Sequence, residues 1–127
     1  MRKLFRDDIE ISKDKVVVKP NSIIRYGIIS PFDLVLGKGC VIHYNAISKS
    51  DILAENVLVY GDILAKRNIT ISDSKVEGKI VAGGNIKIEN CEAEELLADG
   101  DILVMKNVTA KRVEANGDLV IKGNLRA

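Results

Sequence analysis

A repeat of about seventeen residues runs through this sequence and constrains its fold more than any other feature. Each copy contains an apolar pair, a small residue, two turn residues, an Asn or Asp, and then an apolar-x-apolar segment. Successive copies are offset by 18, 18, 17, 17, 16 and 17 residues and begin at Glu10, Ile28, Ala46, Ile63, Ile80, Leu96 and Val113. A fixed period of this length indicates a solenoid, in which each unit stacks on the next.

Aligned columns support the repeat. The small position contains Ser12, Ser30, Ser48, Ala65, Ala82, Ala98 and Ala115. The first apolar position after the turn contains Val16, Leu34, Ile52, Ile69, Ile86, Ile102 and Leu119. The turn position itself contains Lys15, Asp33, Asp51, Asn68, Asn85, Asp101 and Asp118. Like residues in register are expected to stack in like positions of successive coils.

A third segment follows each unit and completes the coil. These segments begin at Asn21, Gly39, Asn56, Asp73, Asn90, Asn107 and Asn124. Each coil then contains three short strands with alternating inward and outward side chains. Asn, Asp and Gly suit the corners between the strands, because they tolerate left-handed backbone geometry and bond their own chain locally.

The pattern predicts an all-β, single-stranded parallel β-helix of seven coils, each of 16–18 residues with three short strands. No segment shows a helical period of 3.6 over ten residues. We expect a right-handed coil; the alternative is the left-handed β-helix of hexapeptide acyltransferases, whose period is a strict eighteen. Residues 9–127 form the predicted domain, and residues 1–8 form an N-terminal tail or cap.

Composition excludes several functional classes. Lys and Arg total 19 and Asp and Glu total 18, so the sequence lacks the basic excess of nucleic-acid-binding proteins. No apolar run is long enough to span a membrane, and the first residues lack the apolar core of a secretory signal. We therefore expect a cytoplasmic protein.

The Gly61-Asp62-Ile63 motif, the small column and the seventeen-residue coil resemble bactofilins over residues 9–127. The resemblance implies a cytoskeletal protein that forms a right-handed β-helix and polymerises end to end without nucleotide. The chain departs from that family in having only Pro20 and Pro31 rather than Pro-rich tails, and no Phe in its last coils. We therefore expect a non-enzymatic scaffold that associates with itself, with a β-helical binding or adaptor module of another assembly as the alternative. Its expected partners are further copies of itself, with a membrane surface or another scaffold protein as further candidates.

Two surfaces are predicted to assemble. A β-helix has two open ends whose unpaired backbone groups can template pairing, and a segment covering Arg2 to Asp8 could fold over the first end. The predicted end edges contain Ile9, Ile11, Val16, Val17, Val18, Leu119, Val120, Ile121 and Leu125. Alternation predicts an outward aliphatic column that makes a lateral face, beginning at Ile11 and continuing with Ile29, Ile47, Leu64, Val81 and Leu97.

Two further outward columns are apolar only early in the chain. One contains Ile23, Val41 and Leu58, and the other contains Val17, Val35 and Leu53. The lateral face is therefore expected to be strongest in the first four coils. The alternative is that the corner is wide enough to bury both aliphatic columns.

The sequence offers little catalytic chemistry. Cys40 and Cys91 fall three coils apart in one column, about 14 Å, too far for a disulfide or a shared zinc ion. His43 is the single histidine, and an acyltransferase using it is a remote alternative. The Asn and Asp column lacks the glycine-rich nonapeptide of calcium-binding β-rolls and is better explained as corner chemistry. We predict no catalytic residues, cofactor or metal.

The N-terminal residues Met1 to Arg6 mix basic and apolar side chains. They resemble the short membrane-binding N-termini of some bactofilins, which implies contact of Leu4 and Phe5 with the inner face of the membrane. Such a short segment binds weakly alone, although a polymer would multiply the effect. A solvated tail is the alternative.

Overall fold

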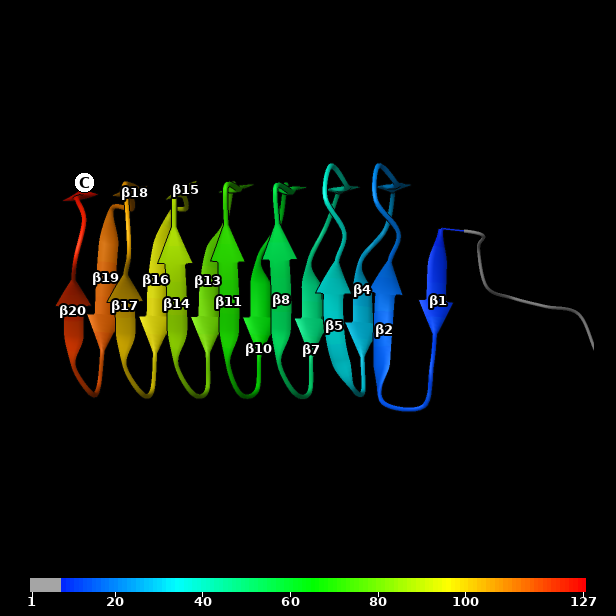
Figure 1. Ribbon diagram of the computed structural model, residues 1–127, viewed down its shortest axis with the longest axis horizontal. Helices are drawn as coiled ribbons and strands as arrows, with labels where there is room; N and C mark the ends of the chain where they lie inside the picture. The colour runs from blue at the N-terminus through cyan, green and yellow to red at the C-terminus, as the bar shows by residue number, and fades with distance from the viewer. Residues whose placement is uncertain (1–7) are drawn as a thin grey trace, which may run out of the picture.

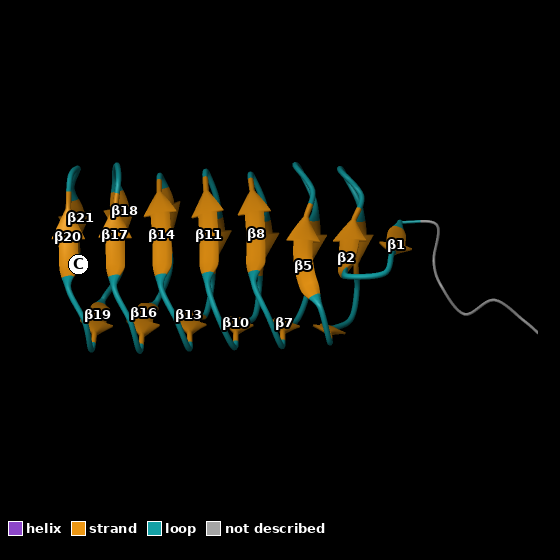
Figure 2. Cartoon of the chain, turned by 60° about the horizontal axis from the view of Figure 1, so that its bottom comes forward, coloured by secondary structure: helices purple, strands orange, loops and turns teal. Residues whose placement is uncertain are grey.

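The structure is a computed structural model that describes residues 8–127, and every regular element in that range is a β-strand. Three sheets wind together as a right-handed solenoid of about seven coils (Figure 1). Figure 2 shows the coils side by side along one axis, with a single turn of chain between successive strands of a sheet. The predicted all-β parallel β-helix is thus confirmed.

Sheet A contains eight strands, of which the last seven are parallel: β1 (Ile9–Ile11), β2 (Lys15–Val18), β5 (Asp33–Leu36), β8 (Ile52–Glu55), β11 (Ile69–Ser72), β14 (Ile86–Glu89), β17 (Ile102–Val104) and β20 (Leu119–Ile121). Sheet B contains seven parallel strands: β3 (Ile23–Ile24), β6 (Val41–Ile42), β9 (Leu58–Val59), β12 (Lys75–Val76), β15 (Cys91–Glu92), β18 (Val108–Thr109) and β21 (Leu125–Arg126). Sheet C contains six: β4 (Ile28–Ser30), β7 (Ala46–Ser48), β10 (Ile63–Ala65), β13 (Lys79–Ala82), β16 (Glu95–Ala98) and β19 (Arg112–Ala115).

We number the coils from the N-terminus. Coil 1 consists of β2 and β3. Coils 2 to 7 each run through one strand of sheet C, one of sheet A and one of sheet B, so coil 7 is β19, β20 and β21. From coil 2 onward the pairing follows the sequence repeat residue by residue; for example, Ile63 pairs with Ala46 on one side and with Ile80 on the other.

The core is a set of inward columns that run the length of the solenoid. Ile63, Ile69 and Ile80 are almost completely buried, as are the inward residues of neighbouring coils. In the small column, the buried Ser48 hydroxyl donates to the carbonyl of Phe32 at 2.7 Å and accepts from the amide of Ser50 at 2.9 Å. Its burial is therefore compatible with a dry core, because both hydrogen-bonding functions are satisfied.

The corner between sheets C and A is held by a row of side chains that bridge coils. Along this row the Oδ1 atom accepts the backbone N–H of the equivalent residue one coil later, at 2.8–3.1 Å, for Asp33, Asp51, Asn68, Asn85 and Asp101; Asp118 donates the last of these bonds. A hydrogen bond from the Ser50 side chain, followed by the Asp51 amide, lowers the pKa of Asp33. The Asn and Asp column therefore stabilises the corners between strands, as the sequence predicts.

The corner between sheets A and B uses left-handed backbone geometry in its first five turns. Gly39 has φ of 81°, and the four other residues have φ between 52° and 62°: Asn21, Asn56, Asp73 and Asn90. Asn is one of the few residues with a side chain that adopts this conformation at low energy. The sequence preference for Asn at this corner follows directly.

The repeat alignment is wrong in its first copy. It predicts that residues 10–12 lie beside Ile28–Ser30 in sheet C, whereas β1 pairs antiparallel with β2 in sheet A. The predicted alignment would put Glu10 in the inward column below Ile28, and burying a lone carboxylate is costly. In the hairpin Glu10 is exposed, and its carboxylate lies 3.9 Å from the Lys19 ammonium.

Candidate functional site

Coil 7, the last described coil, has core positions that no described coil covers. Leu119 and Ile121 point inward in the same columns as Ile102 and Val104 of coil 6. Ile102 and Val104 are 0% exposed, whereas Leu119 is 42% and Ile121 is 46% exposed. Leu125, the inward residue of β21, is partly buried against the core. The last described coil therefore presents an apolar surface at the axis of the solenoid.

The same end carries three unpaired strand edges. Strands β19, β20 and β21 are each the last strand of their sheet among the described residues. Their outer backbone groups can form hydrogen bonds with an added strand. Edge pairing and apolar cover are thus offered on one surface, whose inward side chains are the predicted residues Leu119, Ile121 and Leu125. The predicted residue Val120 lies on the same strand but points outward.

The opposite end is built differently. Val16 and Val18 of β2 are buried, and β1 covers the edge of that strand with Ile9 opposite Val18 and Ile11 opposite Val16. Ile9 also packs against the core cluster. Ile9 and Ile11, predicted as part of an open edge, are thus the covering strand. At this end the outer edges of β3 and β4 are the uncovered ones among the described strands.

The outward column of sheet C runs along the outside of coils 2 to 6. Ile29 pairs with Ile47, and the column continues through Leu64, Val81 and Leu97. Ile29 is 69% exposed and the next four are partly exposed, whereas their inward neighbours are buried. The alternative in which this column is buried is therefore wrong. Ile11 does not belong to the column, because it lies opposite Val16 in sheet A.

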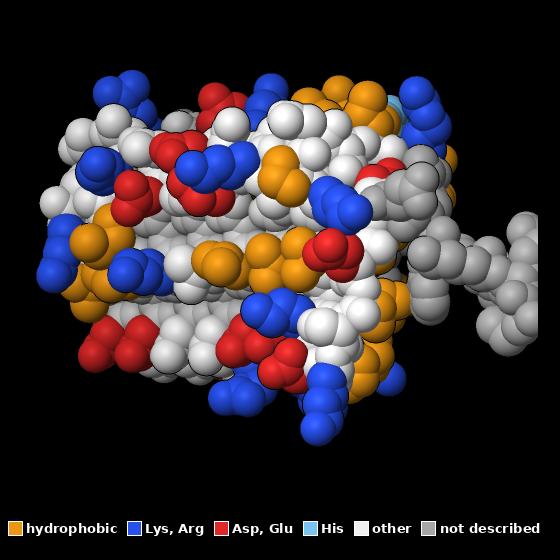
Figure 3. All heavy atoms as spheres, turned by 45° about the vertical axis from the view of Figure 1, so that its right-hand side comes forward, with side chains coloured by type: hydrophobic (Ala, Val, Ile, Leu, Met, Phe, Trp, Pro, Cys, Tyr) orange, Lys and Arg blue, Asp and Glu red, His pale blue; other side chains and the backbone are white. Residues whose placement is uncertain are grey.

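The outward columns of the other two sheets change character along the chain. In sheet B the outward residues Ile23, Val41 and Leu58 are followed by Lys75 and Glu92, whose charged groups lie 3.9 Å apart. In sheet A, Val35 and Leu53 are followed by Thr70 and Lys87. Figure 3 shows the result on one side of the molecule: hydrophobic side chains gather in separate groups with charged side chains between them.

An aromatic cluster at the corner between sheets B and C was not predicted as a surface. Tyr26, Tyr44 and Tyr60 are all exposed, and the ring centroids of His43 and Tyr60 lie 5.3 Å apart. The available signal was spacing, because Tyr60 follows His43 by one coil length of seventeen residues. Tyrosine is enriched in protein interfaces relative to the rest of the protein surface.

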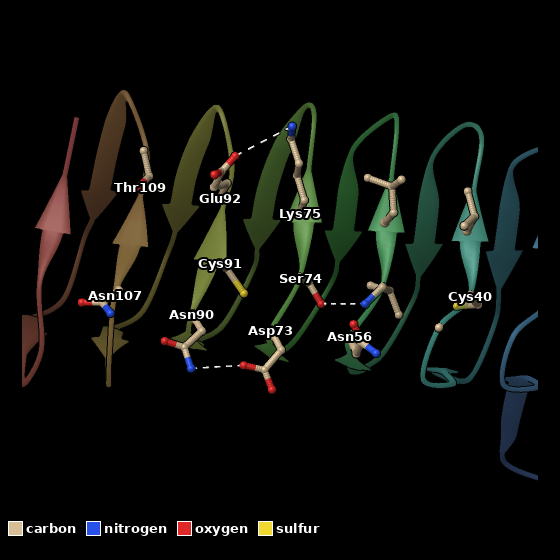
Figure 4. Close-up of a pocket in the computed structure, with 14 residues that line it drawn as sticks. Cys40, Asn56, Asp73, Ser74, Lys75, Asn90, Cys91, Glu92, Asn107 and Thr109 are labelled. Carbon is tan, nitrogen blue, oxygen red and sulfur yellow. Dashed lines mark hydrogen bonds and ion pairs between the residues drawn. The ribbon is translucent and has the colours of Figure 1, made fainter.

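A shallow open groove of about 740 Å³ runs along the outer face of sheet B (Figure 4). The side chains along it bond mainly with one another: the Asn90 amide donates to Asp73 Oδ1 at 3.1 Å, and Lys75 pairs with Glu92. Val41 and Leu58 line its N-terminal part. The groove thus has an apolar half and a polar half in which Lys75 pairs with Glu92 and Asp73 accepts a hydrogen bond from Asn90.

Cys40 and Cys91 also line this groove but are buried free thiols. Burial raises the pKa of each thiol to about 11. Such thiols remain protonated at neutral pH and are poor nucleophiles. Within residues 8–127, no three His, Cys, Asp or Glu side chains come together as a metal-binding group.

Comparison with protein-family models, curated proteins and solved structures finds no match to this chain. Within the part of the chain that the structure describes, no helix has the length and apolar character needed to cross a bilayer. The predicted membrane contact at Leu4 and Phe5 lies outside the described residues.

Proposed function

We propose that this chain is a non-enzymatic scaffold subunit, similar to a bactofilin, that associates end to end with further copies of itself. The observation that carries the proposal is the half-exposed pair Leu119 and Ile121, on a coil whose three strands are each the last of their sheet among the described residues. A second copy that covers this end would bury both side chains and pair the edges in one step. The resemblance in repeat length and small column supports the same role.

Lateral association is the second element of the proposal. The outward column of sheet C presents aliphatic side chains from five successive coils, about 4.8 Å apart. A row of large apolar side chains with one spacing can pack against the same row of a second copy. In this scheme Ile29 and Ile47 bring solenoids together side by side, while coil 7 extends them along the axis.

The experiment combines electron microscopy and light scattering on the purified chain and on Leu119→Lys/Ile121→Lys. Both positions are half exposed in the single chain, so the variant should still fold. A charged group there opposes any partner that covers the end, so assemblies should shrink at least tenfold in mean mass. Purified chain that stays monomeric at high concentration, with no filaments, would refute the proposal.

Two variants separate the surfaces. The Val120 side chain lies between the two tested positions and points outward. Val120→Lys should therefore leave axial assembly intact. Ile47→Lys/Leu64→Lys changes the lateral face and should reduce bundling without shortening single filaments. If the Val120 variant is as defective as the inward pair, the effect is general charge repulsion and not loss of end contact.

An adaptor that binds another protein without polymerising is the second candidate function. The exposed tyrosines around His43 favour it, since aromatic side chains contribute strongly to protein interfaces. An adaptor is expected to give discrete particles in micrographs. Leu119→Lys/Ile121→Lys should then have the same mean mass as the unmodified chain.

A further inference from the structure

The three sheets do not begin together. In the described chain, sheets A and B each contribute a parallel strand to coil 1, whereas sheet C begins with β4 in coil 2. The segment that the repeat assigns to the vacant place is residues 10–12, and these residues lie at the end of sheet A in and beside β1 (Figure 1). One short strand thus has two edges available to it: that of β2, which it occupies, and that of β4, which no described strand covers.

The present position of β1 depends on a three-residue ladder with β2 and on the packing of Ile9 against the core. The strand has three residues, and the hairpin is closed by the Ser12 amide donating to Lys15 at 3.0 Å and the Lys19 amide donating to Asp8 at 2.8 Å. Glu10 and Ile11 are exposed, and the ion pair between Glu10 and Lys19 is solvated and therefore weak. Short end strands of this kind open locally at much lower free energy than the core.

The edge of β4 can accept the same strand without burying its charge. If Ile9 and Ile11 point inward below Ile28 and Ser30, Glu10 points outward beside Ile29. This placement is shifted by one residue from the sequence repeat. It leaves four residues between Ile11 and Val16, where the next coil has three between Ser30 and Leu34. A corner one residue longer is a small change, since coil lengths in this chain already vary from 16 to 18 residues.

The seat of β1 determines whether the first end can receive coil 7 of a second copy. Continuing the solenoid would pair β20 of the second copy with β2, with Leu119 over Val16 and Ile121 over Val18, and would pair β21 with β3. While β1 lies on β2, sheet A projects by one extra strand, about 4.8 Å. This projection keeps sheets B and C of the two copies too far apart to pair. In sheet C the same stacking leaves one strand position empty between β19 of the second copy and β4. This empty position is the alternative position for β1.

We infer that β1 is an exchangeable end strand that controls axial assembly. On β2 it closes the first end of the single chain. When it moves to the edge of β4, it uncovers β2 for β20 of a second copy and fills the gap in sheet C. The inference rests on the proposed end-to-end association and adds its control and its polarity, since coil 7 of each copy then meets coil 1 of the next.

The first test locks the strand with Ile11→Cys/Val16→Cys. The two positions lie directly opposite in the antiparallel pair, where Cα atoms are about 4.5–5.5 Å apart, within the range of a disulfide. Cys40 and Cys91 are buried and do not compete. The oxidised chain should form assemblies at least tenfold lower in mean mass than the same chain after reduction. Equal assembly of the two forms would overturn the inference while leaving end-to-end association in place.

The second test traps the alternative seat with Glu10→Cys/Ile29→Cys, positions that become neighbours only when the strand lies on β4. The disulfide between positions 10 and 29 should be enriched in the assembled fraction, as measured by mass spectrometry. Glu10→Cys/Leu64→Cys is the matched control, because Leu64 lies two further strands along the same column and should give no bond.

The two tests separate the inference from the proposed function. If the unmodified chain never assembles, the scaffold proposal fails. Strand exchange is then tested by the disulfide between positions 10 and 29 alone. A monomer in which β1 moves to the edge of β4 still forms this disulfide under oxidising conditions. Absence of that disulfide, in monomers or in assemblies, overturns the exchange.

Discussion

Coil 1 and coil 7 are made from the same repeat, yet their inward residues have different surroundings. Val16 and Val18 are buried at one end, whereas Leu119 and Ile121 are nearly half exposed at the other. The difference does not arise from the side chains, which are all large and aliphatic. It arises because β1 pairs with β2, while no described strand follows β20. Burial in a solenoid is thus a property of neighbouring coils.

The largest expected effect separates the interior from the open end. Ile86→Ala removes a buried side chain with a coil on either side and should lower the free energy of unfolding by about 2–5 kcal/mol. Leu119→Ala should lower it by less than half as much in dilute solution, because that side chain is half exposed. Urea denaturation at low protein concentration measures both, and equal losses would mean that coil 7 is covered in the single chain.

A smaller difference is expected at the corner between sheets C and A. Asn68→Ala removes the oxygen that accepts the Asn85 amide at 2.8 Å, and should destabilise the chain by about 1–2 kcal/mol. Asp118→Ala is the matched control at the open end, where no described coil follows to donate to its side chain. Thermal denaturation should show a clear loss for the first variant and little change for the second.

The corner between sheets A and B gives a third comparison along the chain. Asn56 has φ of 54°, whereas the equivalent Asn107 is not among the residues with positive φ. Asn56→Ala should be less stable than Asn56→Gly by about 1 kcal/mol, since alanine is strained in the left-handed region. At Asn107 the order should reverse or vanish, because glycine there only increases the freedom of the unfolded chain. Chemical denaturation of the four variants measures both differences.

The smallest effect concerns the two buried thiols of coils 2 and 5. Burial raises the pKa of Cys40 and Cys91 to about 11, above the ordinary value of 9.0. The folded chain therefore holds these protons more tightly than the unfolded chain. Their contribution to stability should be complete below about pH 9 and should be lost as the pH rises toward 11.

The measurement is the midpoint of thermal unfolding between pH 8 and pH 11, with Cys40→Ala/Cys91→Ala as the control. The control variant should show a shallower decline over this range. Equal slopes for the two proteins would show that the thiols are solvated, and would contradict a closed interior from coil 2 to coil 5.

Much of the fold follows from the sequence because the repeat determines both strand pairing and the pattern of buried residues. The spacing of Ile63, Ile80 and Leu96 predicts their pairing, and alternation within each strand predicts which side chains are buried. Left-handed backbone geometry explains Asn21, Asn56 and Asn90 at the corner between sheets A and B. These features are local or periodic, so a single sequence is enough to find them.

The first strand could not be predicted in the same way. Residues 10–12 match the repeat at Ser12, but a match in the small column does not decide between two available edges. The choice depends on the cost of burying Glu10 and on the free edge of β2, which are tertiary effects. The contact of His43 with Tyr60 was likewise missed, because corner side chains do not follow the alternation of the strands.

The direction of the hydrogen bonds has a mechanical consequence. Strands in this fold run across the long axis, so the bonds between neighbouring coils point along it. Under axial tension the hydrogen bonds between two neighbouring coils share the force. Each pair of coils along the axis carries the same total force. Such a rod is as strong as its weakest boundary and should rupture in steps of one coil, with the three-residue β1 peeling away from β2 at the lowest force.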